Sequence, residues 1–142
     1  MKKFIPFFFV FISLFLSSNV IVAGESLEYK LAVLNAGGFV PRNHITVARF
    51  RSLLNQLSDT YIEDNERIAD MTITARDLLR KAGIEESLLN IMGGLNRLFS
   101  EPLGNQKYAE YAASYVVLRE KGYSHLEAIR GLKAILEGMG IY

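Results

Sequence analysis

Acidic residues form the densest group of side chains that could do chemistry. Five of them lie in one short stretch: Asp59, Glu63, Asp64, Glu66 and Asp70. By helical spacing, Glu63, Glu66 and Asp70 share a face, and carboxylates placed in this way can bind a hard cation or act as acid and base. The stretch lacks the loop pattern of a calcium site and the Glu-x-x-His pattern of helical di-iron sites. The pattern therefore favours a solvated helix face.

The two histidines, His44 and His125, do not indicate a metal site or a catalytic base. His44 falls in an expected loop and His125 at the expected start of a helix, so both are predicted to be exposed. Neither has a second histidine or an acidic residue at ligand spacing. The sequence contains no cysteine, which excludes thiolate ligands and disulfides. We therefore predict no enzymatic activity, no cofactor and no metal site.

A tyrosine stripe is the best candidate for a recognition surface. Tyr108, Tyr111 and Tyr115 have the spacing that places side chains on one face of a helix. Tyrosine combines a large apolar ring with a polar tip, which suits both interfaces and ligand pockets. Ordinary partial burial against a neighbouring helix explains the same pattern and is the interpretation that the neighbouring alanines favour.

The first 23 residues have the three parts of a secretory signal peptide. Lys2 and Lys3 form the positive start, an apolar run follows over residues 4–16, and Ala23 is the small residue before the expected cleavage site. An uncleaved membrane anchor is the alternative, and the polar residues 17–19 argue against it. The expected location is the periplasm of a bacterium or the outside of the cell.

The expected exported part, residues 24–142, is long enough for a single domain. The whole chain has a formal net charge of +1, and without Lys2 and Lys3 the net charge is −1. A nearly neutral domain offers no electrostatic basis for binding nucleic acid. We expect this domain to contact a membrane only through the signal peptide, before cleavage.

The strongest pattern predicts one long helix over residues 45–82. Apolar residues recur there at alternating steps of three and four: Val47, Phe50, Leu54, Leu57, Tyr61, Ile68, Met71, Ala75, Leu78 and Ala82. Asn43 is the expected start cap, and Gly83 the expected stop. A break would come near Asp64, but residues 63–66 hold neither glycine nor proline, so we expect a continuous helix.

Such a helix would be about 57 Å long. A compact domain of this size is shorter, so the apolar stripe predicts a helix that packs against a partner. The stripe therefore adds Leu54 and Leu57 to the predicted interaction surface.

Four shorter helices are expected around the long one. The first covers residues 26–36, where an alternating pattern leaves a strand as the alternative. The others cover residues 85–99, 106–121 and 124–137, and the last begins with a capping box of Ser124 and Glu127. Gly93 and Gly94 lie inside a helix, where each costs about 1 kcal/mol relative to alanine. Their presence predicts either the close approach of another element or a kink.

Together these patterns predict an all-α fold: a small helical bundle built on one long central helix, preceded by a cleaved signal peptide. The expected function is protein–protein interaction, as an envelope subunit, an adaptor or a chaperone-like factor. The expected partner is another protein or a second copy of the chain in a homodimer. The alternative is a binder of a small apolar ligand in a helical pocket, and an enzyme that uses the acidic face is a third hypothesis.

Overall fold

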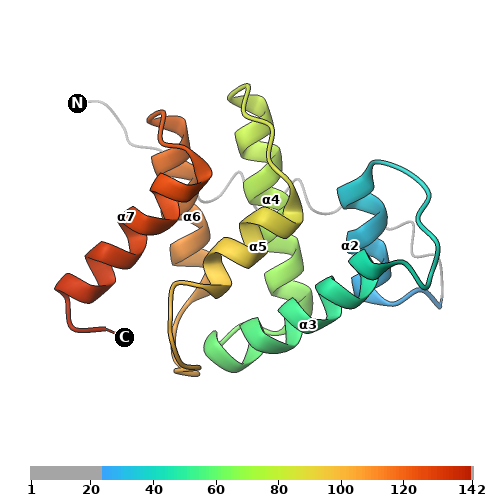
Figure 1. The fold of residues 1–142 in the computed structure, drawn as a ribbon, viewed down its shortest axis with the longest axis horizontal. Helices are drawn as coiled ribbons and strands as arrows, with labels where there is room; N and C mark the ends of the chain where they lie inside the picture. The colour runs from blue at the N-terminus through green and yellow to red at the C-terminus, as the bar shows by residue number, and fades with distance from the viewer. Residues whose placement is uncertain (1–23, 142) are drawn as a thin grey trace, which may run out of the picture.

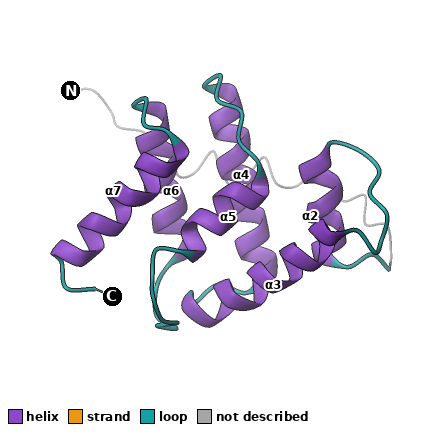
Figure 2. Cartoon of the chain, in the orientation of Figure 1, coloured by secondary structure: helices purple, strands orange, loops and turns teal. Residues whose placement is uncertain are grey.

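The computed structural model describes residues 24–141, and the fold over this range is all-helical, as predicted. Figure 2 shows helices joined by loops, and the described residues contain no strand beyond an isolated parallel bridge between Tyr61 and Gln106. The predicted signal peptide lies outside the described residues. The helices are α2 (Leu27–Ala36), α3 (Ile45–Thr60), α4 (Asn65–Lys81), α5 (Leu88–Asn96), α6 (Tyr108–Glu120) and α7 (His125–Gly138).

The helices form an elongated bundle, with α2 at one end of the long axis and α7 at the other (Figure 1). Helix α5 lies across the middle of the bundle and contacts every other described helix. Its Leu88, Ile91, Met92 and Leu95 are all fully buried. The central element is therefore a short apolar helix and not the long helix that the sequence predicted. A nine-residue helix of mostly apolar residues can contact neighbours on most of its sides because it has little polar surface to solvate.

The prediction of one continuous helix over residues 45–82 is wrong, because the chain breaks between α3 and α4. Tyr61 leaves the helix in an extended conformation, with φ −105° and ψ 155°. Its ring is buried, and its hydroxyl donates a hydrogen bond to the Leu95 carbonyl at 2.9 Å. Asp64 then starts α4, since its side chain accepts a hydrogen bond from the Arg67 amide at 2.9 Å. A buried tyrosine followed by an N-cap thus ends the helix without glycine or proline.

Because of the break, the two parts of the apolar stripe lie on α3 and α4, which pack against each other. Helix α3 packs against both α2 and α4, so the stripe is covered within the chain. The side chains of Leu54 and Leu57 are 2% and 0% exposed. Because they are buried in the core, the argument for an external partner that rested on an overlong helix no longer holds.

Most of the predicted helix ends are confirmed. Helix α2 is a helix and not a strand, with Ser26 as its N-cap and Gly37 in the left-handed conformation (φ 71°) at its end. The capping box of Ser124 and Glu127 is present at the start of α7. The cap of α3 is a correction: His44, and not Asn43, occupies the N-cap, and its Nδ1 accepts a hydrogen bond from the Thr46 amide at 3.2 Å.

The two adjacent glycines of α5 have different roles. A Cβ atom at Gly94 would lie 2.7 Å from Ile129 Cδ1 and 2.9 Å from His125 Cε1, both on α7. A Cβ atom at Gly93 would have no heavy atom within 4 Å. The expectation that another element approaches the glycine pair is therefore confirmed at Gly94. The missing side chain there lets α7 lie close against α5.

This difference predicts opposite effects for the same substitution at neighbouring positions. Gly93→Ala is expected to stabilise the protein by about 0.5–1 kcal/mol, because alanine limits the freedom of the unfolded chain. Gly94→Ala is expected to destabilise it by about 1–3 kcal/mol relative to Gly93→Ala, because Ile129 and His125 must move. Urea unfolding of the two variants beside the wild type measures both, and equal shifts would show that the α5–α7 contact adapts freely.

Candidate functional site

The predicted acidic face does not exist as one surface. Glu63 precedes α4, and its carboxylate accepts hydrogen bonds from the amides of Tyr108 (2.9 Å) and Ala109 (3.3 Å), so it caps the start of α6. Asp64 caps α4. Asp59 lies near the end of α3, whereas Glu66 and Asp70 are one turn apart on α4, where burial and then the charge of Glu66 raise the pKa of Asp70. Two of the five carboxylates therefore anchor helix starts, which the prediction of a shared helical face missed.

The tyrosine stripe faces the interior. Tyr108 and Tyr115 are fully buried, and Tyr111 is partly buried. The Tyr108 hydroxyl lies 2.7 Å from the hydroxyl of Thr72, which is itself buried in α4. Of the two interpretations that the sequence left open, burial against neighbouring helices describes these side chains.

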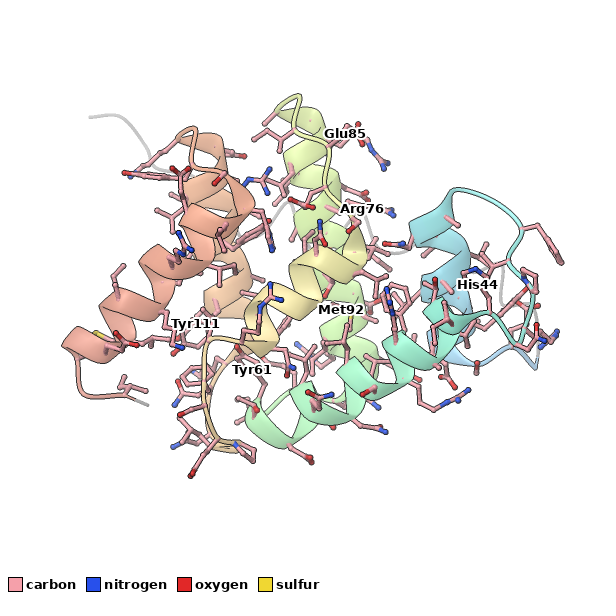
Figure 3. All side chains as sticks on the ribbon, in the orientation of Figure 1. His44, Tyr61, Arg76, Glu85, Met92 and Tyr111 are labelled. Atoms are coloured by element: carbon pink, nitrogen blue, oxygen red, sulfur yellow. The ribbon has the colours of Figure 1, made fainter. Side chains whose placement is uncertain are left out.

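An aromatic cluster surrounds Tyr61 where α3 ends. The Tyr61 ring meets Tyr108, Tyr111 and Phe99 edge to face, with ring centroids 5.1, 5.9 and 5.9 Å away. Figure 3 labels Tyr61 and Tyr111 close together, with Tyr61 below the level of Met92. Edge-to-face contacts add to the stabilisation that ring burial provides, so this cluster fixes the α3–α4 break against α6.

A buried polar cluster is the most distinctive arrangement in the described residues. It joins Glu86, which precedes the Ser87 cap of α5, to Tyr115 and Arg119 of α6 and to His125, the first residue of α7. The Glu86 and Arg119 side chains are only 7% and 10% exposed, and the His125 side chain is 21% exposed. Charged groups this deeply placed are uncommon unless they are paired and hydrogen-bonded.

Glu86 is held by donors on both of its oxygens. Its Oε1 accepts hydrogen bonds from Asn90 Nδ2 at 2.8 Å and from the Ser87 amide at 3.1 Å. Its Oε2 forms an ion pair and hydrogen bond with Arg119 Nη1. Burial alone would raise the pKa of Glu86, but the hydrogen bonds from Arg119, Asn90 and Ser87 outweigh it and hold the pKa below its ordinary value.

Tyr115 connects this ion pair to the histidine. Its hydroxyl oxygen accepts a hydrogen bond from Arg119 Nη1 at 2.7 Å and lies 2.8 Å from His125 Nδ1. Glu86 Oε2 is farther from the hydroxyl, at 3.4 Å. Because arginine can only donate, the single hydroxyl proton of Tyr115 has two acceptors, His125 Nδ1 and Glu86 Oε2, and the contact with His125 is the shorter. Burial raises the pKa of Tyr115, so the phenol keeps this proton.

His125 is the residue whose surroundings the sequence predicted least well. The expectation that it is exposed is wrong, because its ring packs on Gly94 and meets the Tyr115 ring edge to face at 5.7 Å. Burial lowers the pKa of His125; Glu86 raises it, and the positive charges of Arg119 and Arg97 lower it further, leaving it below the ordinary value. His44 is exposed, as predicted.

The cluster pairs one carboxylate with one guanidinium and adds a phenol and a neutral imidazole. Arg119 Nε is buried without a hydrogen-bond partner among the described residues, so the network is not fully satisfied. Within residues 24–141, no group of three or more histidine and carboxylate side chains is placed to hold a metal ion. The arrangement joins three segments of the chain and holds an imidazole near the surface.

Two open grooves are the best-formed hollows of the described residues. The larger, of about 420 Å³, lies between α3 and α5 and is lined by Arg49, Ser52, Leu53, Gln56, Ser87, Leu89 and Asn90. The smaller, of about 160 Å³, is lined by Gln56, Asp59, Thr60, Asn96, Phe99, Ser100, Glu101 and Pro102. Pockets for apolar ligands are enclosed and lined mainly by apolar side chains. Neither groove has the character that the apolar-ligand hypothesis requires.

Sequence spacing could not reveal the polar cluster as a whole. Glu86 and His125 come from segments far apart in the chain. The residues that flank each of them have the pattern of an ordinary exposed helix start. Tyr115 and Arg119 are one helical turn apart, and the buried side of this helix was predicted from its tyrosines. An arginine on the tyrosine side of the helix was the available signal, because a buried arginine requires a carboxylate nearby.

The described chain is therefore a small all-helical protein with an apolar core and one buried polar cluster shared by its last three helices. None of its described helices is both long enough and apolar enough to cross a membrane. The MoxZ family model matches residues 30–136, which extend from α2 almost to the end of α7, and the chain belongs to the MoxZ family. No curated protein and no solved structure matches the chain significantly.

Proposed function

We propose that this protein is an exported accessory protein of a methanol dehydrogenase system, and that it acts by binding another protein of that system. The family match carries the proposal, because the MoxZ family is associated with periplasmic methanol dehydrogenase systems. The matched range includes nearly all of the helical fold, so the match rests on the whole fold and not on a short motif. The predicted signal peptide fits the same compartment.

Exposed apolar side chains support a role in protein binding. Of the nine large apolar side chains that are exposed in the described residues, five belong to the hairpin of α6 and α7 at one end of the bundle (Figure 1): Val117, Tyr123, Leu126, Ile135 and Met139, each about half exposed or more. Apolar side chains of this size are typical of the centres of protein interfaces. We propose this hairpin, and not Leu54, Leu57 or the buried tyrosines, as the contact surface. No catalytic step by this chain is part of the proposal.

Binding can be tested with protein purified from the periplasm of an expressing bacterium and with purified methanol dehydrogenase. The mass of the purified chain reports whether the signal peptide is removed after Ala23. Native mass spectrometry and sedimentation of the mixture are expected to show a complex. Ile135→Lys with Met139→Lys is expected to weaken it by about tenfold or more, because both substitutions place a charge in the contact.

A matched control lies at the other end of the bundle. Phe39 is strongly exposed in the loop between α2 and α3, so Phe39→Ser removes a comparable apolar side chain and is expected to leave binding unchanged. A mixture that contains only free components would contradict the proposal. Equal weakening by the Phe39 and the α7 variants would retain the partner but reject the hairpin as the contact surface.

A further inference from the structure

Helix α7 is attached to the rest of the protein mainly by apolar contacts. Its Ala128, Ile129, Leu132 and Leu136 are buried against α5 and α6. Within residues 24–141, the one side-chain hydrogen bond that links α7 to another helix joins His125 Nδ1 and the Tyr115 hydroxyl at 2.8 Å. This polar contact lies at the first residue of the helix, where α7 leaves the turn after α6. Its strength therefore affects how firmly the start of α7 is held.

We propose that the contact between His125 and Tyr115 is an acid-sensitive latch, which holds α7 against α5 and α6 while the imidazole is neutral and weakens when it is protonated. The inference concerns the folded chain alone, and it does not depend on the proposed partner.

A neutral imidazole suits the hydrogen bonds of the docked state. With the imidazole hydrogen on Nε2, the Tyr115 hydroxyl donates to His125 Nδ1 at 2.8 Å while its oxygen accepts from Arg119 Nη1 at 2.7 Å. A protonated ring carries a hydrogen on Nδ1, so this contact must reverse, with Nδ1 donating to the same phenol oxygen that accepts from Arg119. Tyr115 could then direct its proton only toward Glu86 Oε2, which is 3.4 Å away. Protonation thus brings two cationic donors, Arg119 and the imidazolium, onto one phenol oxygen and moves the hydroxyl proton to a longer hydrogen bond.

Burial of the His125 ring opposes its protonation, and the charges that face the ring act in both directions. Arg119 approaches from α6 and Arg97 from the end of α5, while Glu86 supplies the one carboxylate, with its Oε2 3.8 Å from Nδ1. Glu86 is already committed to Arg119, so it offers only part of its charge to a second cation. The ring is also enclosed between Gly94 and Tyr115, which removes water that would solvate a positive charge.

The sign of the pH dependence follows from these surroundings. The pKa of His125 is lowered in the docked state, whereas an undocked imidazole has an ordinary pKa of about 6.5. The undocked state therefore binds more protons as the pH falls through this range, and acid favours it. The stabilisation from the docked, neutral ring is fully present above the ordinary pKa and decreases below it. Undocking exposes the buried apolar face of α7.

Amide hydrogen exchange measured by mass spectrometry tests the latch directly. After correction for the intrinsic exchange rate, protection of the α7 peptides is expected to fall several-fold between about pH 7.5 and about pH 5.5, on either side of the ordinary histidine pKa. Protection of α2 and α3, at the far end of the bundle, is expected to change little.

His125→Gln is expected to abolish the pH effect on α7. His44→Asn retains a helix-capping side chain and is the matched control, with the pH effect preserved.

An NMR titration keeps the proposal testable if the His125 variant folds poorly. The chain has two histidines, so their ring signals are readily separated and assigned in the wild type. His125 is expected to titrate below the ordinary histidine range. Titration of His125 at or above that range, unchanged protection of α7 at the two pH values, or a pH effect that survives in His125→Gln would each overturn the latch.

Discussion

Leu57→Glu is expected to unfold the protein and not merely to weaken an association. Leu57 is completely buried where α3 packs in the core, so its loss removes apolar contacts that are worth about 2–5 kcal/mol. The new carboxylate would have no partner there, and burying it adds a further penalty of several kcal/mol. The sum approaches the whole stability of a typical domain, about 5–15 kcal/mol. Circular dichroism and urea unfolding measure the outcome.

The control for this prediction lies on the same helix. Ile45 is exposed at the first turn of α3, where a carboxylate is favourable because it faces the positive end of the helix. Ile45→Glu is therefore expected to remain folded, with stability within about 0.5 kcal/mol of the wild type. A folded, monomeric Leu57→Glu variant would show that α3 is not packed as described. A folded variant that loses a dimer would restore the stripe as an intermolecular surface.

Glu86→Ala is expected to lower the stability by about 3–5 kcal/mol, because it leaves Arg119 buried without its counter-ion. Its neighbour Glu85 provides a control of the same residue type, since the Glu85 side chain is 81% exposed and meets only Arg80 at 3.8 Å. Glu85→Ala is expected to change the stability by less than about 1 kcal/mol. Urea unfolding at neutral pH compares the two, and similar losses would mean that the buried pair contributes no more than a surface charge.

The same carboxylate predicts part of the acid sensitivity of the fold. The pKa of Glu86 is lower in the folded chain than in the unfolded chain, so ionised Glu86 stabilises the fold above its ordinary pKa. This stabilisation is lost as the pH falls through the lowered pKa. It acts at more acidic pH than the histidine latch, because ordinary glutamate titrates well below ordinary histidine.

Local signals in the sequence were sufficient to predict most of the helix ends. Ser26 and Ser124 cap their helices as expected, and the left-handed glycines at residues 37, 83 and 122 follow α2, α4 and α6. These features depend on a few neighbouring residues, whose backbone needs are the same in any fold. The all-α class follows from the same signals.

The break at Tyr61 and the central place of α5 depend on contacts between distant segments. Tyr61 leaves α3 because its hydroxyl reaches Leu95 and its backbone pairs with Gln106, neither of which is visible from the periodicity around it. The apolar repeat continued past the break because α3 and α4 both face the one core. A repeat in a single phase therefore indicated a shared core, which two successive helices joined by a turn can also provide.

The polar cluster was missed for a related reason. Three segments supply Glu86, Tyr115 with Arg119, and His125, and each looks like an ordinary helix surface on its own. Their chemistry appears only when α5, α6 and α7 meet. The spacing of residues along the chain does not show which helices pack together. The glycine pair in α5 did indicate that another element comes close.

The close approach of Ile129 to Gly94 predicts how the residues at these two positions vary among members of the family. Ile129 occupies the space that a side chain at position 94 would need, so the two positions cannot vary independently. In other members of the family, a larger residue at position 94 should occur together with a smaller residue at position 129. Ile129→Ala in the Gly94→Ala background should likewise recover part of the loss that Gly94→Ala causes alone. The residues at positions 94 and 129 are thus expected to change together, although they lie on different helices.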